Sequence, residues 1–189
     1  MTAIPWLRDP DQGFKVAQTS GKMVLLDFSA APMCGGCARL DAEVYPQEQV
    51  AKSVNEHFIP VKIHIKERPQ DFSRFKADWT ATLILAEADG AERHRVVGFL
   101  PADDFLAQLH LGLAKAAFSL GQFGEAKAAF EMVATRHPQT DAAPEAVYWT
   151  AVSGYKASGD PEFLKKGGAE LRDRWPQSEW AKKGSVWVS

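Results

Sequence analysis

Cysteine is scarce in this sequence, with only Cys34 and Cys37 among 189 residues. A small fold that depends on several disulfides is therefore excluded, and at this length roughly 70% of the unfolded chain's surface can be buried without such bridges. Neither sign of charge dominates, because 22 basic residues stand against 24 acidic ones and the formal net charge is −2. This balance lacks the basic footprint of a nucleic-acid-binding protein, so we expect no nucleic-acid partner.

Long apolar stretches are also missing. Runs such as Met23 to Leu26 are far shorter than the roughly 20 residues of a membrane-spanning helix. The first ten residues lack the basic and apolar regions of a secretory signal. We therefore expect a cytoplasmic protein with no membrane contact. Nucleotide-binding and serine-hydrolase functions have no support, because the glycine-rich motifs of both classes do not occur.

Three β-rich apolar regions stand out in the first hundred residues: Met23–Phe28, Phe58–Ile65, and Thr82–Ala86 with Arg95–Val97 after it. The apolar residues between the first two regions recur at helical spacing. This spacing predicts a crossover helix and therefore a parallel strand pair. Asp89-Gly90 is a hairpin signal, so the last two strands are expected to be antiparallel. The predicted order is helix, strand, helix, strand, helix, hairpin.

The sequence Cys34-Gly-Gly-Cys37 falls where the first strand should end and a helix should begin. A C-x-x-C pair beside a β-α-β pattern indicates a redox-active dithiol. A thiol at a helix N-terminus faces unpaired N–H groups, which favour the thiolate and lower its pKa from about 8.5 toward neutrality. We therefore assign Cys34 as the attacking thiol and the more buried Cys37 as the resolving thiol.

Two other interpretations of the cysteines remain open. They could be inert core residues, or half of a zinc site, although a structural zinc site needs four ligands and no second C-x-x-C or paired histidine spacing is present. The five histidines show no metal spacing, and His64 alternates with Lys62 on a strand as a packed or solvent-facing residue.

Residues 6 to about 109 resemble thioredoxin, and more closely the thioredoxin-like proteins with an N-terminal tryptophan. The residues that carry the resemblance are Val24–Ala30, Cys34–Cys37, Val61–Ile65, Trp79–Ile84 and Gly98. The resemblance implies a thioredoxin fold with a mixed central sheet, and thiol–disulfide exchange on protein substrates.

The same resemblance implies further site residues. Asp27 matches the buried carboxylate that relays a proton to the resolving cysteine, and Lys62 matches its lysine neighbour. A carboxylate among Val-Leu-Leu and Phe would be desolvated, which raises its pKa and suits it to acid–base work. The alternative is that Asp27 only caps a loop or forms a salt bridge with Lys62. The substrate-binding positions that the resemblance implies are Met33, Thr80, Ala81 and Gly98.

Two positions depart from the thioredoxin pattern. Met33 replaces the tryptophan before the first cysteine, and the stretch from Asp27 to Cys34 is one residue longer. Ala81 stands where thioredoxins carry a cis-proline. A cis peptide before a residue other than proline is unfavourable by about 3 to 4 kcal/mol, so we expect a trans peptide at Ala81. Such a peptide would leave space beside Cys34.

After Leu100-Pro101 the sequence becomes rich in alanine with helical spacing. A shift of 38 residues superposes Gly121 on Gly159 and Pro138 on Pro176, which indicates an internal repeat. Offsets in the first copy resemble the tetratricopeptide helix-turn-helix pattern, whereas the second copy has Pro161 and Gly168 where the first has phenylalanine. The alanines and phenylalanines at helical spacing are core packing, and two repeats bury too little surface to form an independent binding array. We therefore expect the helices to dock on the first half of the chain or on a second copy of it, with a partner protein as a further hypothesis.

The sequence therefore predicts an α/β thioredoxin-like domain over residues 1–109 and an all-α, tetratricopeptide-like helical hairpin region over 110–189. The leading function is a protein dithiol–disulfide oxidoreductase with no cofactor beyond its redox-active disulfide. One alternative is a non-catalytic scaffold. Another is zinc or a [2Fe–2S] cluster held by Cys34 and Cys37 of two subunits in a homodimer.

Overall fold

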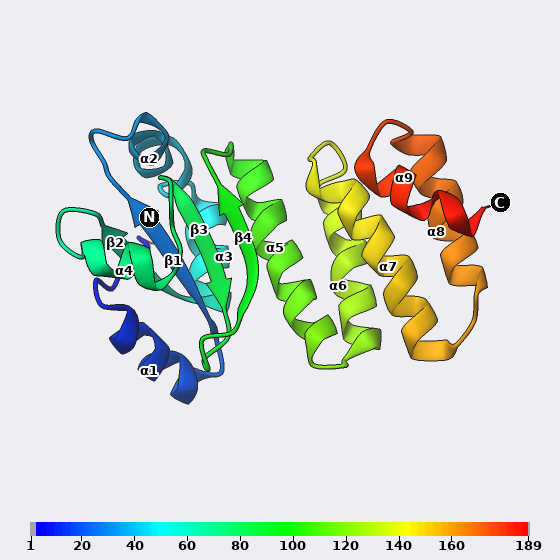
Figure 1. The fold of residues 1–189 in the computed structure, drawn as a ribbon, viewed down its shortest axis with the longest axis horizontal. Coiled ribbons are helices and arrows are strands. Elements are labelled where there is room, and N and C mark those ends of the chain that lie inside the picture. Colours follow the sequence, from blue (N-terminus) through cyan, green and yellow to red (C-terminus); the bar gives the residue numbers. More distant parts are fainter. Residues whose placement is uncertain (1–2, 189) are drawn as a thin grey trace. The chain divides into compact units, whose positions relative to one another are not determined.

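The computed structural model describes residues 3 to 188, and the chain divides into two compact units between Leu106 and Ala107. The first unit, the sheet unit, contains a β-sheet and its covering helices (Figure 1). Its elements are α1 (Pro10–Ser20), β1 (Met23–Ser29), α2 (Gly35–Arg39), the π-helical turn η1 (Leu40–Val44), α3 (Glu48–His57), β2 (Phe58–His64), α4 (Pro69–Arg74), β3 (Thr82–Ala86) and β4 (Glu92–Val97).

The sheet has the strand order β2-β1-β3-β4. β1 runs parallel to β2, with Met23 opposite Phe58, and antiparallel to β3. β3 and β4 form an antiparallel hairpin whose turn contains Gly90, at a φ of 90° that favours glycine. The structure therefore confirms the mixed sheet, the parallel crossover and the hairpin that the sequence predicts.

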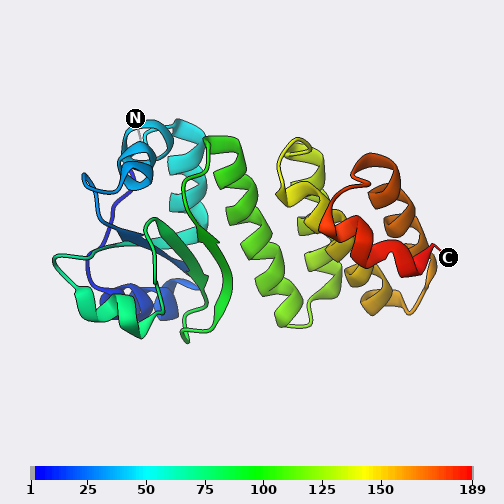
Figure 2. The same ribbon diagram turned by 45° about the horizontal axis from the view of Figure 1, so that its top comes forward.

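Helices cover both faces of the sheet, which explains why every residue of β1 is buried. Val24, Leu26 and Phe28 share one core cluster with residues of α1 and α4. Figures 1 and 2 show α1 and α4 on the face of the sheet opposite to α3. Because side chains alternate along a strand, Leu25 and Asp27 point to the other face, where η1 and α3 lie.

The N-terminal segment extends the sheet beyond β2. The Leu7 N–H donates to the Pro60 carbonyl, and the Leu7 carbonyl accepts from the Lys62 N–H, each over 2.9 Å. The chain then enters α1, which begins after Asp9, whose side chain accepts a hydrogen bond from the N–H of Asp11. These contacts place the N-terminal segment beside Lys62.

The second unit, the helical unit, consists of helices that follow one another along the chain. α5 (Ala102–Ser119) runs through the boundary between the units, and the boundary expected between residues 109 and 110 falls inside this helix. The remaining elements are α6 (Phe123–Arg136), α7 (Ala142–Ser158), α8 (Glu162–Arg174), α9 (Glu179–Gly184) and the 3₁₀ turn η2 (Ser185–Trp187). Within residues 3 to 188, no helix is long and apolar enough to cross a membrane.

The 38-residue repeat is visible in the backbone of the helical unit. Gly121 and Gly159 both have a φ of 75°, one before α6 and the other before α8. The C-cap of α6 is His137, with φ −125° and ψ 50°, and the C-cap of α8 is Trp175, with φ −135° and ψ 57°. The turn before each helix and the C-terminal end of each helix therefore have matching backbone conformations, whereas a tetratricopeptide nature of this unit stays a prediction.

Candidate active site

Cys34 and Cys37 lie at the C-terminal end of β1, where α2 begins, and they form a disulfide. Cys34 is the N-cap of this five-residue helix, and its sulfur accepts a 3.1 Å hydrogen bond from the Cys37 N–H. Cys34 is half-buried, whereas the Cys37 side chain is only 2% exposed. This difference in access suits an outer sulfur that meets a substrate and an inner sulfur that does not.

Asp27 lies in the middle of β1 and is 1% exposed. Its Oδ2 accepts a 2.9 Å hydrogen bond from the Tyr45 hydroxyl, whereas its Oδ1 has no hydrogen-bond partner among the described residues. Burial raises the pKa of Asp27 from 3.8 to about 6, against the opposing effects of the Lys62 charge and the Tyr45 hydrogen bond. The desolvation expected from the sequence is thus present, while the catalytic role of Asp27 stays a prediction.

Lys62 connects Asp27 with the protein surface. Its Nζ lies 3.5 Å from Asp27 Oδ2 and also donates a hydrogen bond to Asp41, a partly exposed residue of η1. The salt bridge between Lys62 and Asp27 that the sequence offered as an alternative role is therefore formed. It does not exclude acid–base work, because the pKa of Asp27 stays raised beside it.

A groove of roughly 480 Å³ runs beside the disulfide. Three of the four predicted substrate-binding residues line it, namely Met33, Thr80 and Gly98. Met33 is 76% exposed, and Trp79, which also lines the groove, is 69% exposed. Exposed apolar side chains of this size beside a reactive group are typical of a surface that binds other molecules.

Ala81, the fourth predicted residue, is buried and does not line the groove. The expected trans peptide is wrong, because the Thr80–Ala81 bond is cis. Tertiary hydrogen bonds hold the backbone on both sides: the Ala81 carbonyl accepts from the Gly98 N–H over 2.8 Å, and the Thr82 hydroxyl donates to the Trp79 carbonyl over 2.8 Å. Such contacts can fix a backbone conformation that local preference disfavours. The access route expected from a trans peptide therefore loses its basis.

Phe99 packs over the second glycine of the C-x-x-C motif. A Cβ placed on Gly36 would lie 3.3 Å from the Phe99 Cβ, whereas one placed on Gly35 would meet no atom within 4 Å. The Arg39 guanidinium lies 4.1 Å from the Phe99 ring centroid and is itself paired with Glu43. Phe99 thus forms a fixed wall of the groove beside Cys34.

His64 contacts the loop that leads from β1 to the cysteines. Its Nδ1 faces the Lys66 N–H at 3.2 Å, and its Nε2 lies 2.9 Å from the Ala31 carbonyl. Because Nδ1 accepts, Nε2 carries the proton and donates to Ala31. His64 is therefore a packed histidine, as expected, and it fixes the loop before Cys34.

Sequence reasoning missed three neighbours of the site: Tyr45, Trp79 and Phe99. Tyr45 follows the π-helical turn η1, whose geometry no residue pattern in this segment predicts. Trp79 could have been found, because it adjoins the predicted residues Thr80 and Ala81. Phe99 could have been found in the same way, because it directly follows the predicted residue Gly98.

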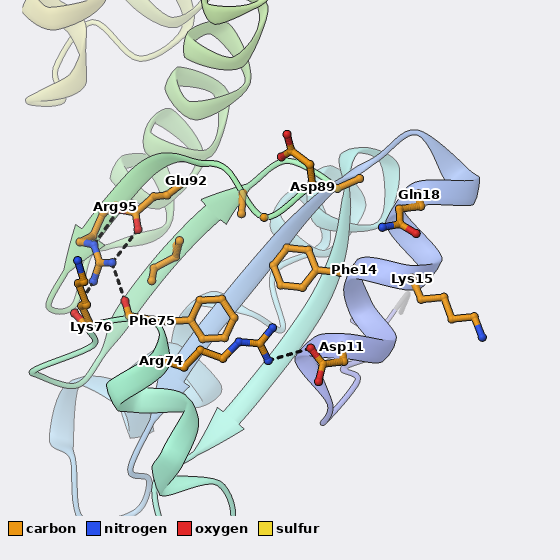
Figure 3. Close-up of a pocket in the computed structure, with 14 residues that line it drawn as sticks. Asp11, Phe14, Lys15, Gln18, Arg74, Phe75, Lys76, Asp89, Glu92 and Arg95 are labelled. Carbon is orange, nitrogen blue, oxygen red and sulfur yellow. Dashed lines mark hydrogen bonds and ion pairs between the residues drawn. The ribbon is translucent and has the colours of Figure 1, made fainter.

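A second hollow, of roughly 620 Å³, lies at the opposite end of the sheet unit (Figure 3). The rings of Phe14 and Phe75 stack at its floor, with centroids 6.1 Å apart. Figure 3 shows Arg74 reaching Asp11 and Arg95 reaching Glu92, so charged pairs form its rim. The sequence did not point to this hollow, and none of the predicted site residues lines it.

Solved structures with a similar fold support the architecture of the sheet unit. A DsbH oxidoreductase has a TM-score of 0.53 at 13% identity, with 59% of this chain and 85% of that chain covered. A putative disulphide-isomerase from Bacteroides thetaiotaomicron has a TM-score of 0.51 at 28% identity, with 59% and 94% covered. A thioredoxin from Thermus thermophilus has a TM-score of 0.50 at 23% identity, with 58% and 85% covered.

Sequence comparison leads to the same family. The thiol:disulfide interchange protein DsbD of Campylobacter jejuni (strain RM1221) is 27% identical over 96 residues. That match covers 49% of this chain but only 16% of the relative, so the chain corresponds to a small part of that protein. The family described as thioredoxin-like domain matches residues 10–112, which is more than half of the chain. The chain therefore belongs to the thioredoxin-like family, and the similar proteins named above include disulfide oxidoreductases.

Proposed function

We propose that this chain is a protein dithiol–disulfide oxidoreductase that acts through Cys34 and Cys37. The observation that carries the proposal is a C-x-x-C disulfide with one accessible and one buried sulfur, placed beside a groove in a thioredoxin-like domain. The buried Asp27, with its raised pKa, supports it. Asp27 and Lys62 act on protons, and Met33, Thr80 and Gly98 contact the substrate.

In the first step, the reduced protein attacks a substrate disulfide with the Cys34 thiolate. A bond forms between Cys34 Sγ and one substrate sulfur, the substrate S–S bond breaks, and the second substrate sulfur leaves as a thiolate that takes a proton from water. The Cys37 N–H, which points at Cys34 Sγ, stabilises negative charge on the attacking sulfur.

In the second step, Cys37 resolves the mixed disulfide. Its thiol gives up a proton, with Asp27 as the acceptor, and the resulting thiolate attacks Cys34 Sγ. The Cys34–Cys37 disulfide forms, and the first substrate sulfur leaves as a thiolate that takes a proton from water, while Asp27 releases its proton to solvent. The substrate disulfide has then been reduced to two thiols, while the protein dithiol has been oxidised.

The groove suits a polypeptide substrate more than a small molecule. It is open, and its exposed lining residues Met33 and Trp79 offer apolar contact beside Cys34. An extended segment around a substrate cysteine could lie across such a surface. Phe99 closes one wall, so the substrate approaches Cys34 from the side of Met33 and Trp79.

The assignment of the two cysteines is tested by trapping. Cys37→Ser, reduced beforehand, should accumulate a covalent adduct with disulfide-bonded insulin, because the mixed disulfide at Cys34 cannot be resolved. Cys34→Ser should form none, since the remaining thiol is buried. Nonreducing electrophoresis and mass spectrometry measure both adducts, with the double variant Cys34→Ser/Cys37→Ser as the blank.

Equal trapping by the two single variants would contradict the assignment. A wild-type protein that does not reduce insulin in the presence of dithiothreitol would instead favour the non-catalytic scaffold. Within residues 3 to 188, no three side chains of His, Cys, Asp or Glu gather as ligands in one copy of the chain. Zinc or a [2Fe–2S] cluster shared by the cysteine pairs of two subunits stays a prediction.

The helical unit extends the proposal to partner docking. Helices α6, α7 and α8 enclose a groove of roughly 510 Å³ with apolar walls that include Val147, Ala151 and Phe163. Basic and acidic side chains both line it, and Arg174 is paired with Glu170 and Lys127 with Glu131. The apolar walls suit a partner segment that carries apolar side chains.

A further inference from the structure

The two oxygens of the Asp27 carboxyl group have different surroundings. Oδ2 accepts the Tyr45 hydroxyl over 2.9 Å and lies 3.5 Å from Lys62 Nζ. Oδ1 is buried and has no hydrogen-bond partner among the described residues. A hydrogen-bond donor and a positive charge thus both gather at Oδ2, which leaves Oδ1 as the oxygen that can take up and release a proton.

Tyr45 is held firmly in this position. The π-helical turn η1 closes with the Tyr45 N–H donating to the Leu40 carbonyl over 2.9 Å. The Tyr45 ring packs against Trp6, with centroids 5.0 Å apart, and against Phe105 at 5.7 Å. Lys62 Nζ lies 4.9 Å from the centroid of the same ring. The ring has little freedom, so its hydroxyl stays aimed at Asp27.

The Tyr45 hydroxyl can act only as a donor toward Asp27 at neutral pH. Burial and the neighbouring Asp27 hold the pKa of Tyr45 well above its usual value. The hydroxyl is therefore protonated, and it donates to Oδ2 whether Asp27 is ionised or carries its proton on Oδ1.

We propose that Tyr45 is a positioning residue for disulfide exchange, in that its hydroxyl ties Asp27 Oδ2 and confines the exchanged proton to Oδ1. This inference rests on the proposed function. When Cys37 attacks the mixed disulfide, its sulfur gives up a proton and Oδ1 takes it. Tyr45 forms and breaks no covalent bond in this step.

The charged groups that face Asp27 come from two elements. Lys62 lies on β2, and Asp41 lies on η1. The Lys62 charge and the Tyr45 hydrogen bond lower the pKa of Asp27, whereas the Asp41 charge raises it. Removing the Tyr45 hydroxyl should therefore raise the pKa of Asp27 above about 6, with Lys62 and Asp41 unchanged.

The first experiment measures the carboxyl group itself. The ¹³C signal of the Asp27 carboxyl is followed against pH in the oxidised wild-type protein and in Tyr45→Phe, which keeps the packed ring and loses only the hydroxyl. The midpoint should move to higher pH in Tyr45→Phe and stay at the wild-type value in the control Tyr148→Phe, a tyrosine of the helical unit. An unchanged midpoint in Tyr45→Phe overturns the proposal.

A second measurement does not depend on the folding of Tyr45→Phe. Replacement of the tyrosines by 3-fluorotyrosine makes the hydroxyl more acidic and therefore a stronger donor. The Asp27 midpoint should then move to lower pH. A shift to higher pH, or none, contradicts the role of the hydroxyl.

The third measurement concerns exchange. Tyr45→Phe should reduce insulin disulfides about tenfold more slowly on the acidic limb of the rate profile, below pH 6, because a hydrogen bond to a charged group contributes about that factor. In an Asp27→Asn background, the same change should leave the profile unaltered. An equal slowing in both backgrounds would show a structural effect only. If the wild-type protein reduces no insulin, the proposed function fails, while the carboxyl titration still decides whether Tyr45 controls Asp27.

Discussion

In the sheet unit, the groups that meet around Asp27 come from β1, η1 and β2, which are separated by up to 35 residues, from Asp27 to Lys62. In the helical unit, by contrast, α6 packs on α7 and α7 on α8, each the next element along the chain. The first arrangement places a charged group in a buried setting that several segments must complete. The second repeats one local contact with a period of 38 residues. The surroundings of Asp27 are thus assembled from segments that lie far apart in the sequence. The helical unit is assembled from contacts between consecutive helices.

The largest expected effect concerns the buried charge of the sheet unit. Because burial raises the folded pKa of Asp27 to about 6 from 3.8, the folded state holds the proton more tightly than the unfolded state. The stabilisation from this proton is complete below about pH 4 and is lost as pH rises through about 6. Asp27→Asn, which carries no charge, should therefore be more stable than wild type by up to about 3 kcal/mol at pH 8.

The difference in free energy of unfolding between Asp27→Asn and the wild type should shrink as pH falls from about 6 to about 4. Urea denaturation of the oxidised proteins, followed by NMR signals of β1, measures it at both ends of the range. The amide oxygen that Asp27→Asn introduces can still accept the Tyr45 hydrogen bond, so the variant tests charge and not shape. A stability difference that is the same at pH 4 and pH 8 would contradict the raised pKa.

The next effect concerns close packing in the helical unit. A Cβ placed on Gly167 of α8 would lie 2.4 Å from the Ala151 Cβ of α7, so Gly167→Ala should destabilise this unit by about 1 to 3 kcal/mol. Gly124→Ala is the matched control, because no atom lies within 4 Å of its added Cβ. We expect the control to be neutral or stabilising by up to about 1 kcal/mol.

Thermal denaturation, combined with amide hydrogen exchange resolved by unit, checks this pair of variants. Faster exchange confined to α7 and α8 in Gly167→Ala would show that the two units respond separately. If amide exchange in β1 became faster by the same factor, the sheet unit and the helical unit would lose stability together.

The smallest effect concerns the glycines between the cysteines. Gly36→Ala brings its Cβ within 3.3 Å of Phe99, which must shift by a few tenths of an ångström. We expect a loss of less than about 1 kcal/mol and a modest change in the rate of insulin reduction. Gly35→Ala has open space and should match wild type in both measurements. A larger effect at Gly35 than at Gly36 would show that Phe99 does not form a wall of the groove beside Cys34.

Local patterns predicted much of the sheet unit. The apolar run around Asp27 was enough to predict a buried strand and a desolvated carboxylate. Asp89-Gly90 was enough to predict the hairpin turn. The contacts of Tyr45 could not be predicted, because they depend on a π-helical turn that shifts the residues after Cys37. The cis peptide at Ala81 could not be predicted either, because hydrogen bonds from Gly98 and Thr82 hold the backbone against the local preference for a trans peptide. The sequence therefore indicated the reactive groups better than their surroundings.

The pairing of Leu7 with β2 has a consequence for association between copies. Strands at the edge of a sheet tend to pair with other chains through their unused N–H and C=O groups. On β2, the outward C=O of Pro60 and the outward N–H of Lys62 are already occupied by Leu7. Pro60 also offers no N–H on that side, so a foreign strand would not find a full row of donors there. Pairing of two copies along this edge would first require Leu7 to detach, which gives up two hydrogen bonds and protects the protein against sheet-to-sheet aggregation on the side of Lys62.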